Sequence, residues 1–246
     1  MMRISRRPIA TRLHRWSLAR LGYGNGNPAT NGEYRLLDEL PEAPTVFDVG
    51  AHHGDYGLAV LNRRPNANVY CFEPAAVTFQ QLAARVGGRA RLRRFALSDT
   101  TGSRTLYGDC TGSAMASLFR RDLRWLGLDN SLEETVETRT LDDVCATEGA
   151  DHIDLLKIDA EGADHLVLLG ARRMLDEQRI VRIMFEYGGT ALDSHFCMRD
   201  FYRLLHGFTL YRVLPDGLLP LGAYGEHLEI AHYSNYCAIR VQPARP

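Results

Sequence analysis

The chain has 246 residues and a formal net charge of −1, and one α/β domain with a full hydrophobic core is ordinary at this length. The near-zero charge argues against a protein whose main partner is nucleic acid, because such proteins are usually basic. Five scattered cysteines form no C-x-x-C pair, which favours reduced thiols in a cytoplasmic protein over disulfides or a zinc site. We expect no nucleic-acid partner, and homo-oligomerisation stays open.

The first twenty residues hold six arginines and no acidic residue. A basic amphipathic start can bind a membrane or nucleic acid, but the sequence contains no apolar run of 18 residues. We therefore expect no membrane partner. Residues 1–40 are predicted to form an N-terminal helical extension, which packs Ile9, Leu13 and Trp16 on a domain formed by residues 41–246.

Apolar strands, glycine-containing turns and amphipathic helices then alternate along the chain. This alternation predicts an α/β fold with a mostly parallel, doubly wound sheet that is covered on both faces. Late strands over 209–214 and 235–241, with a turn at 215–217 between them, are expected to close the sheet. The earlier predicted strands are 45–50, 68–73, 91–96, 153–159 and 180–187, and the predicted helices are 56–62, 77–86, 164–175 and 198–205.

Residues 100–150 break this rhythm, because they are rich in Gly, Ser and Thr and then in charged residues. Short strands are predicted over 104–107 and 135–140. An insertion of this length after the third strand is more often a lid or a substrate wall than a featureless loop. We expect the insertion, together with residues 224–235, to face the substrate.

A glycine-rich turn follows the first predicted strand. The segment DVGAHHG, residues 48–54, places glycines at the end of the strand and four residues later, where a ligand can approach backbone N–H groups closely. Glu73 ends the second strand, where an acidic side chain can accept both hydroxyls of a ribose. The turn and the acid together predict a nucleotide-type ligand.

The spacing of the glycines distinguishes between such ligands. The dinucleotide fingerprint G-x-G-x-x-G fails, because His52 and Asp55 occupy its second and third glycine positions. The pattern acid-x-Gly-x-x-x-Gly is met by Asp48, Gly50 and Gly54. This pattern suits S-adenosylmethionine, which has no pyrophosphate to bind and whose cationic groups favour a nearby carboxylate.

The segment LLKIDAEG ends the fourth predicted strand with three charged side chains on one face. Lys157, the only lysine in the chain, is the deepest, and we expect it to be an internal ion-pair partner of Glu186 or Asp48. Asp159 and Glu161 lie nearer the carboxyl edge, where doubly wound sheets bind their ligands. These two carboxylates are therefore the better candidates for chemistry.

Six segments together resemble the FkbM-type methyltransferases. The resemblance runs from about residue 22 to residue 238, and its most specific part is the KIDxEG block followed by VLxGA. It implies a class I methyltransferase Rossmann-like fold with S-adenosylmethionine as cofactor, and O-methylation of a small molecule such as a natural product or sugar. The His52-His53 pair departs from the family pattern. The segments are DVGAHHGDYG, CFEP, ALSD, TLDD, LLKIDAEGADHLVLLGA and FEYG.

The resemblance also implies cofactor-binding residues. Gly50 and Gly54 would shape the methionine side of the pocket, Glu73 would hold the ribose, and Ser98 and Asp99 would lie near the adenine. The remaining members of the implied cofactor set are Asp48, Ala51, His52, Pro74 and Asp159.

Methylation of an alcohol requires removal of its proton, by a base within about 3 Å or by a metal that lowers the hydroxyl pKa. Asp159 or Glu161 is a candidate base, and so is His52 or His53 in the first loop. Mg²⁺ bound by Asp159, Glu161 and Glu186 is the less favoured alternative, because no other carboxylate cluster supports a metal site. The predicted acceptor contacts are Ser113, Glu186, Tyr187 and Tyr224.

Two other functional classes remain at this point. A nicotinamide-dependent Rossmann oxidoreductase is disfavoured by the failed dinucleotide fingerprint. A protein that binds the cofactor without catalysis is harder to separate from an enzyme, although the Asp159-x-Glu161 pair favours catalysis. Stabilisation by S-adenosylmethionine rather than NAD would distinguish the cofactor.

Overall fold

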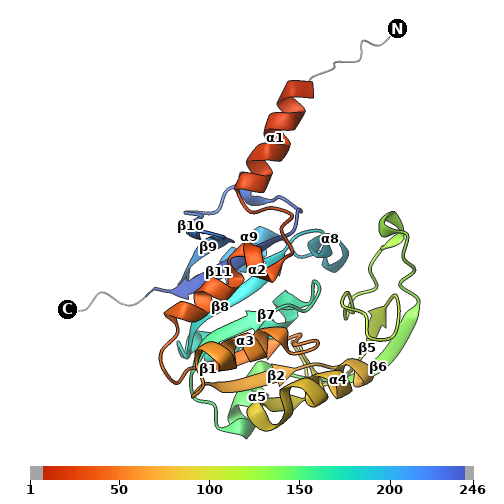
Figure 1. The fold of residues 1–246 in the computed structure, drawn as a ribbon, viewed down its shortest axis with the longest axis vertical. Helices are drawn as coiled ribbons and strands as arrows, with labels where there is room; N and C mark the ends of the chain where they lie inside the picture. Colours follow the sequence, from red (N-terminus) through yellow and green to blue (C-terminus); the bar gives the residue numbers. More distant parts are fainter. Residues whose placement is uncertain (1–7, 242–246) are drawn as a thin grey trace, which may run out of the picture.

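The computed structural model describes residues 8–241. Within these residues, eight strands form one sheet in the order β10-β9-β11-β8-β7-β1-β2-β3 (Figure 1). Strands β3, β2, β1, β7 and β8 are parallel, and β11 runs antiparallel to both β8 and β9. The predicted mostly parallel sheet with a late antiparallel strand is confirmed. The strands are β1 (Thr45–Val49), β2 (Asn68–Phe72), β3 (Arg91–Arg93), β7 (Ile153–Ile158), β8 (Ile180–Tyr187), β9 (Phe208–Leu214), β10 (Gly217–Pro220) and β11 (Ser234–Arg240).

Helices cover both faces of the sheet. Phe47 and Phe72 point to one face and pack with α5, α6, α7 and α9. Val46 and Cys71, their neighbours on the same strands, pack with η1, α3 and α4 on the other face, because successive side chains of a strand alternate. Burial of both faces explains why these strands read as continuous apolar runs. The helices are η1 (Glu33–Glu39), α3 (Asp55–Arg63), α4 (Ala76–Val86), α5 (Leu141–Glu148), α6 (Asp164–Leu169), α7 (Arg172–Asp176), α8 (Thr190–Ser194) and α9 (Met198–Leu204).

Several elements differ from the predictions. The predicted strand 91–96 ends at Arg93, and Ala96–Leu97 is a separate strand, β4, which pairs with β6 in a second sheet. The predicted helix 164–175 is two short helices, α6 and α7, separated at Gly170, where a Cβ would lie 2.0 Å from the carbonyl oxygen of Ser98. Helix α5 was not predicted, although Thr140 caps it by accepting a hydrogen bond from the backbone N–H of Asp143. The turn at 215–217 leads from β9 into the unpredicted hairpin strand β10 rather than directly to β11.

The insertion forms a second, three-stranded sheet of β4 (Ala96–Leu97), β6 (Leu132–Arg139) and β5 (Gly102–Gly108). Both strands predicted in this region are present, and each is longer than predicted. Leu106 and Val136 pack with Ala75 in a small separate core. Figure 1 shows β5 and β6 of this sheet, drawn in yellow-green to green, beside the carboxyl edge of the main sheet.

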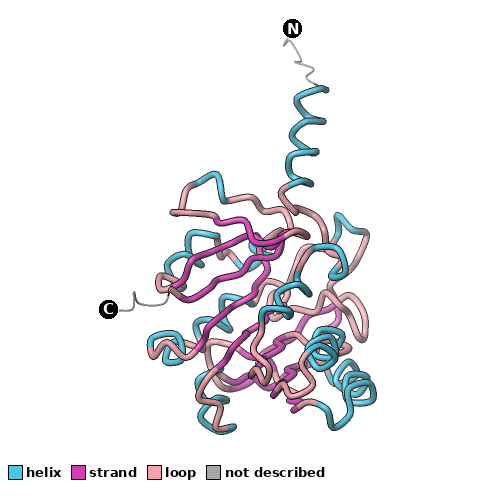
Figure 2. Tube along the Cα trace, turned by 60° about the vertical axis from the view of Figure 1, so that its left-hand side comes forward, coloured by secondary structure: helices cyan, strands magenta, loops and turns pink. Residues whose placement is uncertain are grey.

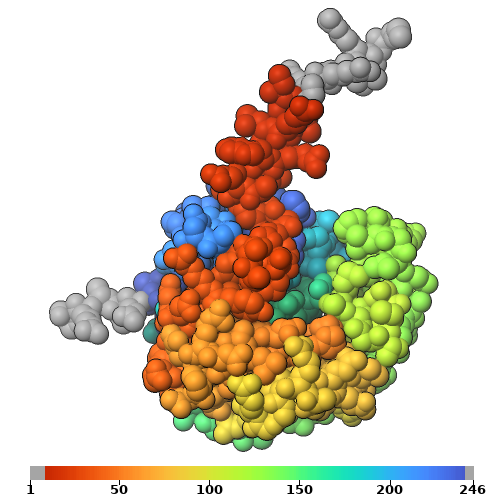
Figure 3. Space-filling view, in the orientation of Figure 1, coloured from red at the N-terminus to blue at the C-terminus, as the bar shows by residue number. Residues whose placement is uncertain are grey.

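The N-terminal helix α1 (Pro8–Arg20) stands away from the rest of the protein in every view (Figures 1, 2 and 3). The exposed fractions of Ile9, Leu13 and Trp16 are 81%, 62% and 61%. The prediction that these side chains pack on the domain is therefore wrong, although the helix itself is present. No described helix is long and apolar enough to cross a membrane.

The chain rejoins the body after α1. Tyr23 is buried with its ring centroid 4.0 Å from the guanidinium of Arg212. Leu36, Leu37 and Leu40 then join the core on the same face as Val46. Part of the predicted extension thus lies in the main core. The division of the chain at residue 40 stays a prediction.

Candidate active site

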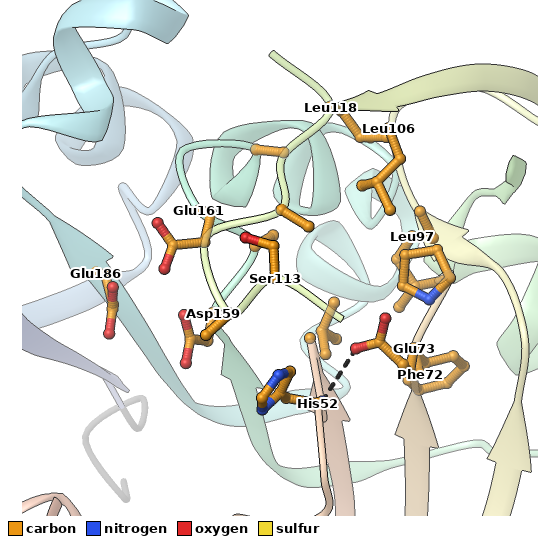
Figure 4. A pocket seen from close by; sticks show the side chains of 18 of the residues that line it. His52, Phe72, Glu73, Leu97, Leu106, Ser113, Leu118, Asp159, Glu161 and Glu186 are labelled. Carbon is orange, nitrogen blue, oxygen red and sulfur yellow. Dashed lines mark hydrogen bonds between the residues drawn. The ribbon is translucent and has the colours of Figure 1, made fainter. Parts of the chain in front are cut away.

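A cavity of about 340 Å³ opens at the carboxyl ends of β1, β2, β7 and β8, the edge at which open α/β sheets bind ligands. Further walls come from the segment that precedes η1, from the insertion and from the segment that precedes β11. In Figure 3 the surface is hollowed between the green insertion and the rest of the protein. Figure 4 shows the side chains that face this space.

The two glycines of the first turn have different roles. Gly50 has a φ of +73°, and a Cβ there would lie 1.8 Å from the carbonyl oxygen of Asp159. Only glycine therefore allows the turn after β1 to approach the loop after β7 this closely. Gly54 does not line the cavity, because a Cβ there would meet Leu82 and Val86 of α4. Gly54 thus serves the packing of α3 on α4.

One half of the cavity, called here the apolar half, is formed by Phe72, Pro74, the segment 95–97 and Leu106, with Glu73 at its edge. Glu73 accepts hydrogen bonds from the backbone N–H groups of His52 (3.0 Å, Figure 4) and Ala75 (2.9 Å). Burial raises the pKa of Glu73 to about 7, and these hydrogen bonds only partly offset the shift. Apolar walls fit a purine ring, and the adjoining carboxylate fits the hydroxyls of a ribose.

The other half, called here the acidic half, presents Glu33, Asp159, Glu161 and Glu186 together with Tyr233. Burial raises the pKa of Glu161 to about 7, and the nearby Asp159 carboxylate adds to the shift. Burial also raises the pKa of Glu186 well above its usual value, and the Tyr233 hydroxyl donates a hydrogen bond to Glu186 at 2.8 Å. None of the described residues that line the cavity is Lys or Arg.

Lys157 lies beneath the cavity, where β7 pairs with β1. The register places it opposite Asp48, and its Nζ lies 3.5 Å from Oδ1 of Asp48 and 3.1 Å from Oδ2 of Asp159. Burial disfavours the charged amine, but the two carboxylates raise the pKa of Lys157 above its usual value. Of the two ion-pair partners predicted for Lys157, Asp48 pairs with it, whereas Glu186 does not; the second partner is Asp159.

Arg121 joins the insertion to the loop after β7. Its guanidinium donates a hydrogen bond to the Glu161 carboxylate, and its Nε lies 3.8 Å from Oδ2 of Asp193 in α8. The hydroxyl of Ser117 also donates to the backbone carbonyl of Glu161 at 2.8 Å. These contacts hold Glu161 in a left-handed backbone conformation, with φ of +51°, which is uncommon for a residue other than glycine and is often found at functional sites.

Half of the site residues proposed from the sequence line the cavity. The residues that do so are Gly50, His52, Glu73, Pro74, Ser113, Asp159, Glu161 and Glu186.

Three proposed catalytic or acceptor-binding residues lie elsewhere. His53 is held outside the cavity, with its Nε2 2.7 Å from Oε1 of Gln81. Tyr187 and Tyr224 donate hydrogen bonds to Glu229, at 2.7 and 2.9 Å, and so point away from the cavity. These three side chains are engaged in the packing around α4 and α9.

Four proposed cofactor-binding residues besides Gly54 also lie outside the lining. Ser98 is buried and donates to Asp99 at 3.0 Å, while Asp99 forms an ion pair with Arg104. In this part of the chain the segment 95–97 lines the cavity, whereas Ser98 and Asp99 do not. Asp48 and Ala51 are buried beneath the turn, where Asp48 accepts a hydrogen bond from the backbone of Gly57.

Sequence reasoning missed Glu33, Arg121 and the apolar segment 95–97. Glu33 lies in the extension rather than in a motif, and Arg121 is one of 28 arginines, so neither carries a local signal. Tyr233 falls within the segment 224–235 that was expected to face the substrate.

Among residues 8–241, no group of three or more His, Cys, Asp or Glu side chains is arranged to hold a metal ion.

The sheet order and the cavity define a class I methyltransferase fold with a site suited to S-adenosylmethionine. A solved methyltransferase FkbM from Methylobacillus flagellatus has this fold: its TM-score is 0.51 at 13% identity, over 82% of this chain and 47% of that one. This chain thus spans about half the length of that structure.

Residues 48–210 match the methyltransferase FkbM domain. The 2-O-methyltransferase NoeI of Sinorhizobium fredii is 30% identical over 196 residues, which cover 74% of this chain and 79% of NoeI. The 31-O-demethyl-FK506 methyltransferase FkbM of Streptomyces tacrolimicus is 34% identical over 202 residues, covering 70% and 75% of the two chains. This chain belongs to the FkbM family of methyltransferases, and its methyl donor is S-adenosylmethionine.

Proposed function

We propose that this methyltransferase methylates a hydroxyl group of an uncharged, polyhydroxylated small molecule, such as a sugar or a glycosylated natural product. The observation that carries the proposal is the acidic half of the cavity, where carboxylates and the Tyr233 hydroxyl face the acceptor without a lining Lys or Arg in the described chain. Carboxylates accept hydrogen bonds from acceptor hydroxyls, whereas they repel a phosphate or a carboxylate.

The printed names of two relatives support oxygen as the acceptor atom. NoeI is named a 2-O-methyltransferase, and the Streptomyces enzyme is named for the 31-O position of FK506. Both names specify an oxygen as the methylated atom, in line with the chemistry of the acidic half.

Methyl transfer is an in-line displacement, so the protein mainly has to hold donor and acceptor aligned and dry, an effect worth several kcal/mol. When bound, S-adenosylmethionine supplies a methyl group on a positively charged sulfur that leaves as a neutral thioether. In our assignment Glu73 accepts hydrogen bonds from the ribose hydroxyls, and the apolar half holds the adenine. Asp159 faces the cationic methionine end, where its negative charge favours binding.

We assign removal of the hydroxyl proton to Glu161. Its pKa of about 7 lies near the working pH, which is the optimum for a general base. Arg121 binds one oxygen of the Glu161 carboxylate and leaves the other for the acceptor hydroxyl. Asp159 already accepts a hydrogen bond from Lys157, and Glu186 already accepts one from the Tyr233 hydroxyl.

The proposal is tested by supplying S-adenosylmethionine with paired acceptors, each a neutral sugar and its phosphate ester, and by detecting methylated product by mass spectrometry. We expect oxygen-linked methyl on the neutral member of a pair and little on the phosphate. Preference for the phosphate, or methylation of nitrogen only, would contradict the proposal. Cofactor binding without turnover on any hydroxyl acceptor would instead favour the non-catalytic alternative.

A further inference from the structure

Helix α1 carries an apolar stripe that no described element covers. Ile9, Leu13 and Trp16 are spaced four and three residues apart, so they share one face of the helix. Each is more than half exposed. Single exposed apolar residues are normal on a protein surface, but a continuous stripe of three large ones on a projecting helix marks an interaction surface.

The charges on the same helix are all positive. Arg12, Arg15 and Arg20 are exposed, and the guanidinium of Arg20 lies 5.7 Å from the ring centroid of Trp16. Helical spacing places Arg12 beside the apolar stripe and Arg20 in line with it, one turn beyond Trp16. The long aliphatic stems of arginine can follow an apolar surface while the charged group reaches a polar one. The stripe is therefore bordered by cations.

The rest of the sequence has the opposite balance. All 30 acidic residues come after residue 32, whereas six arginines lie in the first twenty residues. Two α1 helices from different copies would bring arginine against arginine, so pairing of these helices has no charge complementarity. A partner that offers negative charge next to an apolar interior satisfies both the arginines and the stripe, and an anionic lipid bilayer has this composition.

The joint between α1 and the body connects this surface to the cavity. Gly22 and Gly24 have φ values of +81° and +76°, and the backbone N–H of Gly24 donates to the carbonyl of Tyr233 at 2.8 Å. Gly26 and Pro28, a few residues further on, line the cavity. Helix α1 therefore lies only a few residues along the chain from the wall of the cavity.

From these observations we propose that α1 is a peripheral anchor, which lies in the interface of an anionic membrane with Ile9, Leu13 and Trp16 toward the acyl chains and Arg12, Arg15 and Arg20 at the headgroups. This proposal replaces the expectation that the protein has no membrane partner. It does not depend on the identity of the methyl acceptor, and its test has no activity readout.

The test is flotation of the full-length chain with vesicles of phosphatidylcholine alone or of phosphatidylcholine with phosphatidylglycerol. We expect flotation with the anionic vesicles only, because an arginine near such a surface contributes about 1 kcal/mol, or roughly fivefold in affinity. In a Trp125→Phe background, the emission of Trp16, then the only tryptophan, should shift to the blue on binding.

Matched variants separate the two contributions. Arg12→Gln/Arg15→Gln should weaken binding roughly thirtyfold, whereas Arg94→Gln/Arg172→Gln, which removes two exposed arginines of the body, should not. Leu13→Ser/Trp16→Ser should abolish flotation, whereas Leu192→Ser, at an exposed leucine of α8, should not. These side chains are exposed, so unchanged melting temperatures are expected.

Three results would overturn the proposal. One is equal binding to neutral and anionic vesicles, and another is binding that the two α1 variants do not reduce. The third is no flotation, with the α1 variants instead abolishing a dimer seen by light scattering or a complex with nucleic acid.

Discussion

The two halves of the cavity are built differently. In the apolar half, the lining residues come from the end of β2, from the segment 95–97 that leads from β3 into β4, and from Leu106 of β5. Its one carboxylate, Glu73, is fixed by two backbone N–H groups. In the acidic half, carboxylates come from η1, the loop after β7 and β8, and their partners come from the insertion and from the segment before β11. The apolar half comes from one stretch of the chain, residues 72–106, whereas the acidic half depends on contacts between segments far apart in the sequence.

This difference suggests that one half of the cavity mainly binds the cofactor and the other mainly binds the acceptor and takes part in methyl transfer. A half built from one short stretch of chain, residues 72–106, varies little with the rest of the protein, which suits a cofactor of constant structure. A half assembled from several distant segments can change with any one of them, which suits an acceptor that differs among relatives. We therefore expect substitutions in the apolar half to affect cofactor affinity. Substitutions in the acidic half should affect turnover, except at Asp159, which we assign to the methionine end of the cofactor.

The largest effect is expected at Glu161. Glu161→Gln should lower the turnover number by ~10² to 10⁴, the range for loss of a general base, while cofactor affinity changes little. The control is Asp159→Asn, which should mainly weaken cofactor binding, and chelator should affect neither protein. Single-turnover methyl transfer and calorimetry give the two quantities. An active Glu161→Gln enzyme beside an inactive Asp159→Asn enzyme with normal cofactor affinity would move the base to Asp159.

The next effect concerns Lys157, which lies beneath both halves. Lys157→Met leaves the fully buried Asp48 without its cation, so the free energy of unfolding should fall by about 3 to 5 kcal/mol. Adding Asp48→Asn should restore part of the loss, and Arg94→Met, the same kind of change at an exposed position, should be nearly neutral. Urea unfolding measures all three. A Lys157→Met protein of normal stability but without activity would instead make the lysine part of the catalytic site.

A smaller effect is expected in the apolar half. Glu73→Ala should weaken S-adenosylmethionine binding by about 2 to 3 kcal/mol, because hydrogen bonds from the ribose to a charged acceptor are lost. Glu186→Ala, in the acidic half, should leave cofactor affinity nearly unchanged. Isothermal titration of both variants compares the two halves directly. Equal losses would show that the cofactor also contacts Glu186 and that our division is wrong.

The sequence predicted the parts of the fold that depend on neighbouring residues. The alternation of buried strands and helices located the parallel sheet, and the bounds of β8 agree with those predicted. Gly50 and Glu73 were found because strand ends and glycine turns are local signals. The places of Glu33 and Arg121 in the site, and the exposure of α1, depend on which distant segments of the chain meet. The spacing of residues in the sequence does not predict such contacts. The packing predicted for Ile9 failed for this reason.

A pH dependence of stability should also follow from the buried acids. Burial raises the pKa values of Glu73, Glu161 and Asp164 to about 7, so the folded protein binds their protons more tightly than the unfolded chain does. Their contribution to stability is present below the unfolded pKa values of about 4 to 4.5 and is lost as the pH rises through about 7. The free energy of unfolding should therefore fall across this range.

Denaturant unfolding at several pH values measures this slope, and Asp164→Asn should reduce it. The cationic cofactor should oppose the loss, because a nearby positive charge lowers the pKa of the carboxyl groups around it. Stability that rises over this interval would contradict the pKa values on which the choice of Glu161 as base depends.

The smallest effect is expected for the histidine pair of the first loop, which tests whether any chemistry belongs to the apolar side. His53 lies outside the cavity beside Gln81, so His53→Ala should change turnover by less than about twofold, as for most surface substitutions.

His52 lines the cavity, and burial lowers its pKa, an effect to which the neighbouring His53 adds. A neutral His52 can shape the pocket, with its Nε2 3.5 Å from the carbonyl of Gly112 in the insertion. His52→Ala should therefore raise KM more than it lowers kcat, and His52→Gln should recover part of the difference by restoring a polar group at that position. A loss of turnover with His52→Ala as large as the general-base range, about 10² to 10⁴, would place the base in the first loop and leave Glu161 and Arg121 as a structural link between the insertion and the sheet.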